Sequence, residues 1–193
     1  GTAERNYLAF ADGTSGDARY RGLISYDHNT DKLGIGAGGG TKIELDGNGI
    51  MTNSTQPAFI AYNNSNNNHT FSATETYEQL AFNVEVIDKN SDFSNSTFTA
   101  PVDGTYFVAT NQLFNASSSG EIRHDLAIYV NSTLTLYKQE KGDNYSIPKT
   151  ITLSGLVDLD ASDTVKIYSR VSDTKGRIYV SQTTSTFHGY LVA

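Results

Sequence analysis

The stretch that decides the fold is Phe98-Thr99-Ala100-Pro101-Val102-Asp103-Gly104-Thr105-Tyr106-Phe107-Val108. Pro101 fixes its own φ and cannot donate to a strand ladder, so a strand must end there. Gly104 allows the tight backbone that a turn requires. Aromatic and β-branched residues, which favour strands, follow from Tyr106 onward. The stretch therefore predicts a strand end, a corner and the start of a new strand.

Apolar residues alternate with polar ones on both sides of this corner. After it, two sets fall on opposite faces of one strand: Tyr106, Val108 and Phe114 on the first face, and Phe107, Ala109 and Leu113 on the second. Apolar residues on both faces indicate that one face meets a core and the other meets a neighbouring subunit. Before the corner, we expect Leu80, Phe82, Val84 and Val86 on one face of a single strand. Turn formers recur at roughly 8 to 12 residues, which is typical of a β-sandwich.

Composition restricts the class of protein. The chain has 193 residues, no cysteine, a net charge of −7 and only 18% charged residues. Without cysteine there is no disulfide, thiolate metal site or cysteine nucleophile. An acidic chain without clustered Lys and Arg does not fit nucleic-acid binding, and no apolar run is long enough to span a membrane. Apolar residues do not recur at a helical period, so the sequence predicts an all-β protein of one domain plus a small appendage.

Two motifs carry a resemblance to a known family. They are Phe-x-Ala-Pro-x-x-Gly-x-Tyr over residues 98–106 and Phe187-His188-Gly189 near the C-terminus. From about Gln56 onward, the chain resembles the globular head of the complement q subunit, a jelly-roll family shared with tumour necrosis factor. The family usually has Gly-Asp where this chain has Ser162-Asp163, a difference that affects one turn. The resemblance implies a jelly-roll head over residues 54–193 and assembly into a homotrimer.

Residues 1–53 differ from the rest of the chain. Short strands are expected over Asn6–Ala11, Tyr20–Tyr26, Leu33–Gly38, Thr41–Leu45 and Ile50–Thr52. One face of these strands carries Leu33, Ile35, Ile43, Leu45 and Ile50. So few large apolar side chains cannot form a core alone, and copies of the segment around a threefold axis would cover them.

The pattern Ile-Ser-Tyr-Asp at residues 24–27, with Lys-Ile-x-Leu-Asp at 42–46, resembles short repeats of bacteriophage tail fibres and tailspikes. The resemblance implies that residues 1–53 form an intertwined β stem of a fibre. A merely decorative or unfolded extension is the alternative. Gly1-Thr2 indicates a cut inside a longer protein, so we expect the rest of the fibre to precede it.

Residues that could perform covalent chemistry do not form a recognisable set. No Gly-x-Ser-x-Gly motif occurs, and His28, His69, His124 and His188 are scattered. Carboxylate pairs such as Asp158 and Asp160, or Asp12 and Asp17, are explained by turns. We therefore expect no catalytic residue and no enzyme.

Calcium is the one cofactor that the resemblance suggests. Members of the resembled family often hold Ca²⁺ near the apex of their trimer, and Ca²⁺ prefers oxygen ligands. Loop residues that could supply them are Asp103, Asp143 and Asp173, with Asn144. The family's ligand positions do not match this chain residue by residue, and no other cofactor is expected.

Together these patterns predict the C-terminal, receptor-binding tip of a homotrimeric viral fibre, a phage tail fibre on the virion surface. Its partners would be two identical chains and a host surface glycan or outer-membrane protein, with no nucleic acid and no membrane insertion. Exposed loops would bind the host through amides, hydroxyls and one aromatic ring. The candidate residues are Asn63, Asn64, Asn66, Asn67, His69, Ser118, Asp143, Asn144, Tyr145, Asp173 and Arg177.

Three other functions fit the sequence. The head could be a trimerisation clamp or a capsid-decorating spike. It could be a secreted complement- or cytokine-like ligand, a hypothesis supported by seven Asn-x-Ser/Thr sequons, at Asn53, Asn63, Asn68, Asn95, Asn115, Asn131 and Asn144. It could also be a tailspike depolymerase, which would release new reducing ends from host polysaccharide.

Overall fold

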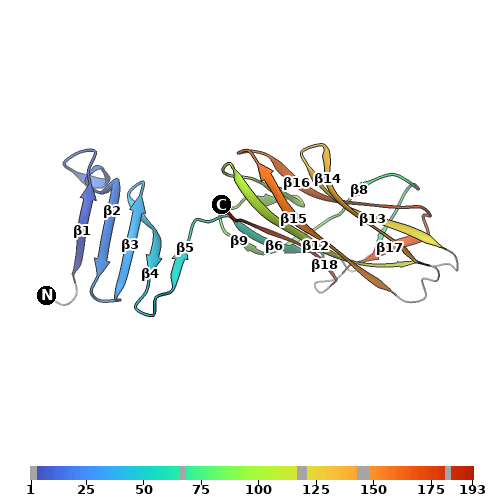
Figure 1. Cartoon of the computed structure of the whole chain (residues 1–193), viewed down its shortest axis with the longest axis horizontal. Helices are drawn as coiled ribbons and strands as arrows, with labels where there is room; N and C mark the ends of the chain where they lie inside the picture. The colour runs from blue at the N-terminus through green and yellow to red at the C-terminus, as the bar shows by residue number, and fades with distance from the viewer. Residues whose placement is uncertain (1–3, 66–67, 117–120, 143–147, 181–183) are drawn as a thin grey trace. The chain divides into compact units, whose positions relative to one another are not determined.

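The computed structural model describes residues 4–65, 68–116, 121–142, 148–180 and 184–193. The chain divides into an N-terminal unit, Gly1–Gln56, and a C-terminal unit, Pro57–Ala193 (Figure 1). Within the described ranges, no helix has the length and apolar character needed to cross a bilayer.

The N-terminal unit is one antiparallel sheet in which each strand pairs with the next along the chain. Its elements are β1 (Arg5–Phe10), the 3-10 helix η1 (Gly16–Tyr20), β2 (Gly22–Asp27), β3 (Lys32–Ala37), β4 (Gly40–Leu45) and β5 (Met51–Asn53). Asp46 closes the turn before β5, because its Oδ1 accepts the N–H groups of Asn48 and Ile50 at 2.9 Å. The strand expected over Tyr20–Tyr26 is wrong at its start: Tyr20 ends η1, and β2 begins at Gly22.

The two faces of this sheet differ in burial. Leu23 and Ser25 are the buried side chains of the described part of the unit, and both lie on one face. The opposite face carries side chains that are 37–72% exposed, which we call the exposed apolar face: Leu8, Phe10, Ile24, Tyr26, Leu33, Ile35, Leu45 and Met51. The register pairs Ile35 with Ile43 and Leu33 with Leu45, so the expected face is correct for these four residues. Ile50, the fifth, lies in the turn before β5.

Glycines alternate along β3 because neighbouring strands pack against them. A Cβ on Gly34 would lie 2.9 Å from Ser25 Oγ, and a Cβ on Gly36 would lie 2.7 Å from the carbonyl oxygen of Gly40. Real Cβ atoms do not approach other atoms so closely. A side chain at either position would therefore force the neighbouring strands to move, and glycine avoids this.

The C-terminal unit is a sandwich of two antiparallel sheets. The six-stranded sheet has the order β10 (Phe93–Ser94), β11 (Thr97–Thr99), β16 (Thr164–Val171), β13 (Ile122–Val130) and β14 (Thr133–Gly142), with β8 (Glu78–Gln79) also on β16. The seven-stranded sheet has the order β7 (His69–Thr70), β17 (Gly176–Tyr179), β12 (Gly104–Ala116), β18 (Ser185–Leu191), β6 (Ala58–Tyr62) and β9 (Val84–Asp88), with β15 (Lys149–Leu159) also on β12. The first and last long strands, β6 and β18, are neighbours, as a jelly roll requires. The predicted all-β jelly-roll class is confirmed.

The corner at Pro101 is built as the sequence predicts. β11 ends at Thr99 and β12 begins at Gly104. The Tyr106 hydroxyl donates to the carbonyl oxygen of Val102 at 2.9 Å and ties the corner to the strand. A Cβ on Gly104 would lie 2.7 Å from the carbonyl oxygen of Ala193, so glycine leaves room for the end of the chain.

Aromatic side chains fill the space between the two sheets. Phe59 stacks on Phe93 and Phe98 with ring centroids 5.2 and 4.6 Å apart, and it meets Phe187 edge-on at 4.8 Å. Tyr106, Val108 and Phe114 are each at most 1% exposed, which confirms that they share a face and shows that this face meets the core. Each fully buried side chain of this size contributes about 1.5–3 kcal/mol.

One predicted strand is wrong. Leu80, Phe82, Val84 and Val86 do not share a strand, because β8 belongs to one sheet and β9 to the other. Leu80 and Phe82, each 2% exposed, lie in the core where the chain crosses between the sheets. Val86 is 56% exposed on β9.

Candidate functional site

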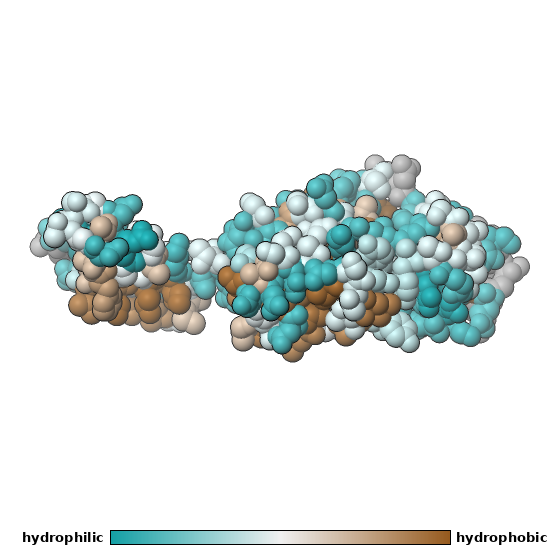
Figure 2. Space-filling model, turned by 90° about the horizontal axis from the view of Figure 1, so that it is seen from above, coloured by the Kyte–Doolittle hydropathy of each residue, from teal (hydrophilic) through white to brown (hydrophobic). Residues whose placement is uncertain are grey.

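The outer side of the seven-stranded sheet carries a set of apolar side chains, which we call the outer head face: Ile60, Ile87, Phe107, Leu156 and Tyr190. The strand register places Phe107 between Leu156 and Tyr190, and Ile60 beside Ile87. Leu156 is 60% exposed and Tyr190 48% exposed. In the space-filling view, brown apolar atoms gather on one side of the C-terminal unit (Figure 2).

A shallow hollow lies in this face, with almost entirely apolar walls. Ala58, Ile60, Ile87, His188 and Tyr190 line it. Burial alone lowers the pKa of His188, which pairs with Ile60 across the strands. A neutral imidazole among apolar side chains suits contact with another protein surface better than acid–base chemistry.

The outer head face could have been identified more fully from sequence. Alternation along the strand places Phe107 and Leu113 on one face, without showing which of the two faces points outward. The same alternation places Leu156 on the face of β15 opposite to that of Leu153 and Val157. Those two side chains are buried, at 8% and 4% exposure. Ile87 could not be found in this way, because a register shift between Ile60 and Ala61 interrupts the pairing of β6 with β9.

The candidate loop residues that the structure describes lie at one end of the sandwich. β12 runs from Gly104, beside Ala193, to Ala116, which pairs with Gly176. Its 13 residues span roughly 40 Å. We call the end beside Gly176 the far end. Asn63, Asn64, His69, Asp173 and Arg177 lie there, since β7 pairs with β17 and the N–H of Asn63 donates to the carbonyl oxygen of Ser185.

Not all of these side chains are available for binding. Asn63 is only 6% exposed, and its Oδ1 accepts the N–H of Ser65 at 2.9 Å, so the expectation that it is an exposed ligand contact is wrong. His69 Nε2 lies 3.3 Å from Glu78 Oε2, and burial lowers the pKa of His69 more than Glu78 raises it. Asn64 is exposed, and Arg177 is half-buried on β17. The other candidates, Asn66, Asn67, Ser118, Asp143, Asn144 and Tyr145, lie outside the described residues.

The carboxylates considered for calcium are not brought together. Asp103 and Asp173 lie at opposite ends of β12, roughly 40 Å apart, so they cannot share an ion. Asp103 Oδ1 accepts the N–H of Ala161 at 2.7 Å, and Asp173 Oδ1 accepts that of Lys175 at 2.9 Å. Both are turn residues, and Asp143 lies outside the described residues. Where the structure describes the chain, no three His, Cys, Asp or Glu side chains are placed to hold a metal ion.

The four histidines considered for catalysis lie on separate elements, whereas Asp158 and Asp160 line one hollow together with Asp103 and Asp163. Asp158 Oδ1 accepts the hydroxyl of Thr105 at 2.8 Å, which is a structural role. His28 lies in the N-terminal unit, His69 on β7, His124 on β13 and His188 on β18. Burial lowers the pKa of His124 to about 4, and the imidazole packs 4.3 Å from the Phe114 ring. Among the described residues, the four histidines are therefore not brought together in one site.

Comparison with known proteins agrees with this geometry. The family described as the C1q domain matches residues 58–192. The solved globular domain of zebrafish complement 1qA protein superposes with a TM-score of 0.50 at 20% sequence identity, covering 72% of this chain and 98% of that one. At this identity, the match establishes the fold alone. No curated protein matches the chain.

Proposed function

The chain belongs to the C1q domain family, and from this premise we propose that it is the homotrimeric, receptor-binding head of a fibre. It attaches to a host surface without covalent chemistry. We place it at the tip of a phage tail fibre, on the outside of the virion.

The observation that carries the proposal is the outer head face. Leu156, Phe107 and Tyr190 stand in one cross-strand row, on the side of the sheet that faces away from the core. Contiguous apolar surface of this kind marks a protein contact. Identical chains related by a threefold axis would cover it and leave the six-stranded sheet outside.

The N-terminal unit supports the assignment to a fibre. Its exposed apolar face carries eight large side chains, while Leu23 is its one buried apolar side chain among the described residues. A unit of this size needs partners to complete a core. Three copies would supply them.

The far end of the head supports a role in adhesion. Asn64, Asp173 and Arg177 supply amide, carboxylate and guanidinium groups there, which suit glycan hydroxyls or polar groups of an outer-membrane protein. Each contact would be weak. Three heads on one fibre would multiply the effect through avidity.

A test of the trimer uses Leu156→Glu, with Leu134→Glu on β14 of the other sheet as the matched control. Three glutamates brought into one contact should weaken association by at least about tenfold, since burying a charge is costly. Sedimentation velocity across a dilution series measures this. Equal association of wild type and Leu156→Glu would refute the use of the outer head face.

A test of adhesion uses the fluorescently labelled full chain on a panel of bacteria. Asn64→Ala with Arg177→Ala should reduce binding, whereas Lys138→Ala, exposed on β14, should not. Cells treated with protease or stripped of polysaccharide distinguish a protein receptor from a glycan. If the Asn64→Ala/Arg177→Ala double variant binds every strain as wild type does, the far end is not the binding site.

A secreted complement-like ligand is the second candidate. The C1q family match applies to it equally, and the seven sequons favour it. Neighbouring genes for tail or baseplate proteins would exclude it. A trimerisation clamp would trimerise but bind no cells, and a depolymerase would generate reducing ends from polysaccharide.

A further inference from the structure

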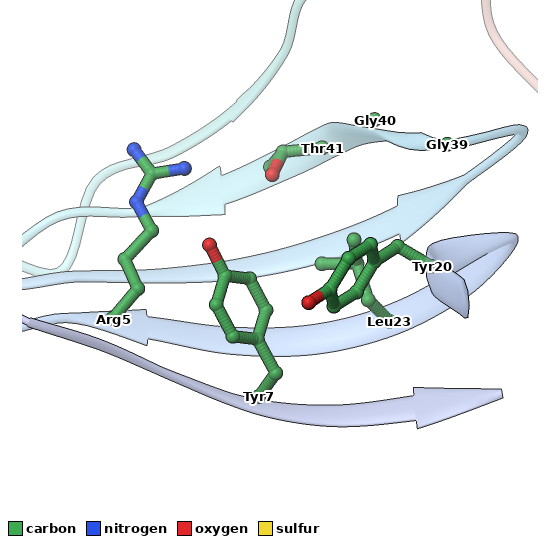
Figure 3. A pocket seen from close by; sticks show the side chains of 7 residues that line it. All are labelled: Arg5, Tyr7, Tyr20, Leu23, Gly39, Gly40 and Thr41. Atoms are coloured by element: carbon green, nitrogen blue, oxygen red, sulfur yellow. The ribbon is translucent and has the colours of Figure 1, made fainter. Parts of the chain in front are cut away.

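The N-terminal unit contains a small pocket on the face opposite its exposed apolar face. Figure 3 shows Arg5, Tyr7 and Thr41 around the pocket, with the Tyr20 side chain extending toward Tyr7. Leu23 lies beneath them, with Gly39 and Gly40 at the edge. The cavity is about 170 Å³. This is well below the roughly 300–1,000 Å³ of sites for drug-sized ligands, and it suits a single ring.

The tyrosines form an aromatic wall. The ring centroids of Tyr7 and Tyr20 are 5.5 Å apart and the rings are tilted by 49°, so they present an angled apolar surface rather than a closed stack. Leu23, 6% exposed, continues this surface at the base of the pocket. Each ring also carries a hydroxyl, which can donate and accept hydrogen bonds.

The other wall is polar but electrically balanced. Arg5 Nε donates to Asp27 Oδ2 at 2.8 Å, and this pairing raises the pKa of the guanidinium. The remaining guanidinium N–H groups and the Thr41 hydroxyl are hydrogen-bonding groups on this wall. Because Asp27 neutralises Arg5, the pocket favours hydroxyl groups over an anion.

The pocket stays accessible when the exposed apolar face is covered. Side chains alternate along β1 and β2, so Arg5, Tyr7 and Leu23 lie on one face, and Leu8 and Ile24 lie on the other. Chains that pack on the apolar face therefore do not block the pocket. A trimer would carry three copies.

We propose that this pocket binds one neutral pyranose ring of a glycan. The apolar C–H face of the sugar lies against Tyr7, Tyr20 and Leu23, and its hydroxyls bond to Arg5 and Thr41. The site goes beyond the proposed function, which gives the N-terminal unit only a structural role and places recognition on the head.

The test is saturation-transfer NMR of the full chain with methyl glycosides of glucose, galactose, mannose and N-acetylglucosamine. Saturation should reach the C–H face of at least one sugar, with millimolar affinity. Tyr20→Ala and Thr41→Val should each weaken binding by about 5-fold or more, since each removes a contact worth about 1 kcal/mol. Tyr137→Ala, on exposed β14, should leave it unchanged.

Three results would overturn the proposal. They are no saturation with any of the four sugars, binding that survives both pocket variants, and tighter binding of methyl glucuronide than of the glucoside. Thr41→Val preserves side-chain shape, so it stays informative if Tyr20→Ala unfolds the unit. Sugar binding should persist in Leu156→Glu, and this separates failure of the pocket from failure of the head.

Discussion

At the scale of single residues, His124 links pH to the stability of the head. It is 1% exposed and packs on Phe114, and a Cβ on Gly176 would lie 2.8 Å from its Cε1. Burial lowers its pKa to about 4, against the opposing effect of Asp125. The folded pKa is below the unfolded value of about 6.5, so the unfolded state takes up the proton first as the pH falls.

We predict that the head loses about 3 kcal/mol between pH 6.5 and pH 4 through this residue. Above about pH 7.5 His124 is almost entirely neutral in both states, and its contribution to stability no longer changes. Urea unfolding at several pH values measures the free energy of unfolding. This free energy should depend less steeply on pH in His124→Gln than in wild type. His28→Gln, at an exposed position of the N-terminal unit, should show the same pH dependence as wild type. An NMR titration giving an ordinary pKa for His124 would contradict the prediction.

Gly189 is a second position where one atom matters. A Cβ there would lie 2.8 Å from the carbonyl oxygen of Phe107 and 2.9 Å from Phe59 Cε1. We predict that Gly189→Ala destabilises the head by about 1–3 kcal/mol, because strand and core must both move. Urea unfolding followed by the near-ultraviolet signal of the tyrosines measures this, with exposed Ser154→Ala as control. If Gly189→Ala and wild type unfold at the same urea concentration, Gly189 is not packed closely against Phe107 and Phe59.

The sequence predicted residues well where the chemistry was local. Pro101, Gly104 and Tyr106 form the corner that their own backbone preferences require. Asn63 was misjudged as exposed because polar composition says nothing about what covers a side chain. Its burial depends on the N–H of Asn63 pairing with Ser185, more than a hundred residues away.

At the scale of elements, the alternation of apolar residues predicts which side chains share a face of a strand better than it predicts which sheet the strand joins. The two sets of β12 lie on opposite faces as predicted, because side chains alternate along a strand with a period of two residues. Leu80 to Val86 also alternates, yet the segment passes from one sheet to the other. Both sheets contribute to one core, so the pattern of apolar residues could not show where the crossing occurs.

The exposed apolar face of the N-terminal unit gives a prediction at this scale. Ile35, 49% exposed at the centre of that face, pairs with Ile24 and Ile43. Ile35→Asn should lower the melting temperature of this unit and weaken association, because burying the isoleucine is worth about 1.5–3 kcal/mol per chain. Circular dichroism at several concentrations measures both effects.

Lys42→Asn is the matched control for this variant. Lys42 lies on the same sheet, and its exposed side chain does not belong to the apolar face. It should melt as wild type does. An Ile35→Asn chain that melts as wild type does at every concentration would mean that no partner covers the face.

At the scale of the whole molecule, sites assembled from distant segments were the hardest to predict. The far end gathers His69 and Arg177 because β7 pairs with β17, which no local pattern indicates. The length of β12 separates Asp103 from Asp173. The pocket of Arg5, Tyr7, Tyr20 and Thr41 draws on β1, η1 and β4, and Tyr20 reaches it only because it ends a helix rather than starting a strand.

Association through two units in one chain leads to the last prediction. If identical chains cover both the outer head face and the exposed apolar face, each contact holds the other at high effective concentration. Leu156→Glu and Ile35→Asn should then each leave a trimer that dissociates on dilution. The double variant should be monomeric at concentrations where either single variant still associates.

Sedimentation equilibrium from sub-micromolar to tens of micromolar chain tests this, with Leu134→Glu plus Lys42→Asn as the control pair. A wild-type chain that stays monomeric and fully folded at micromolar concentration would refute both contacts, since the N-terminal unit buries too little apolar surface to fold alone.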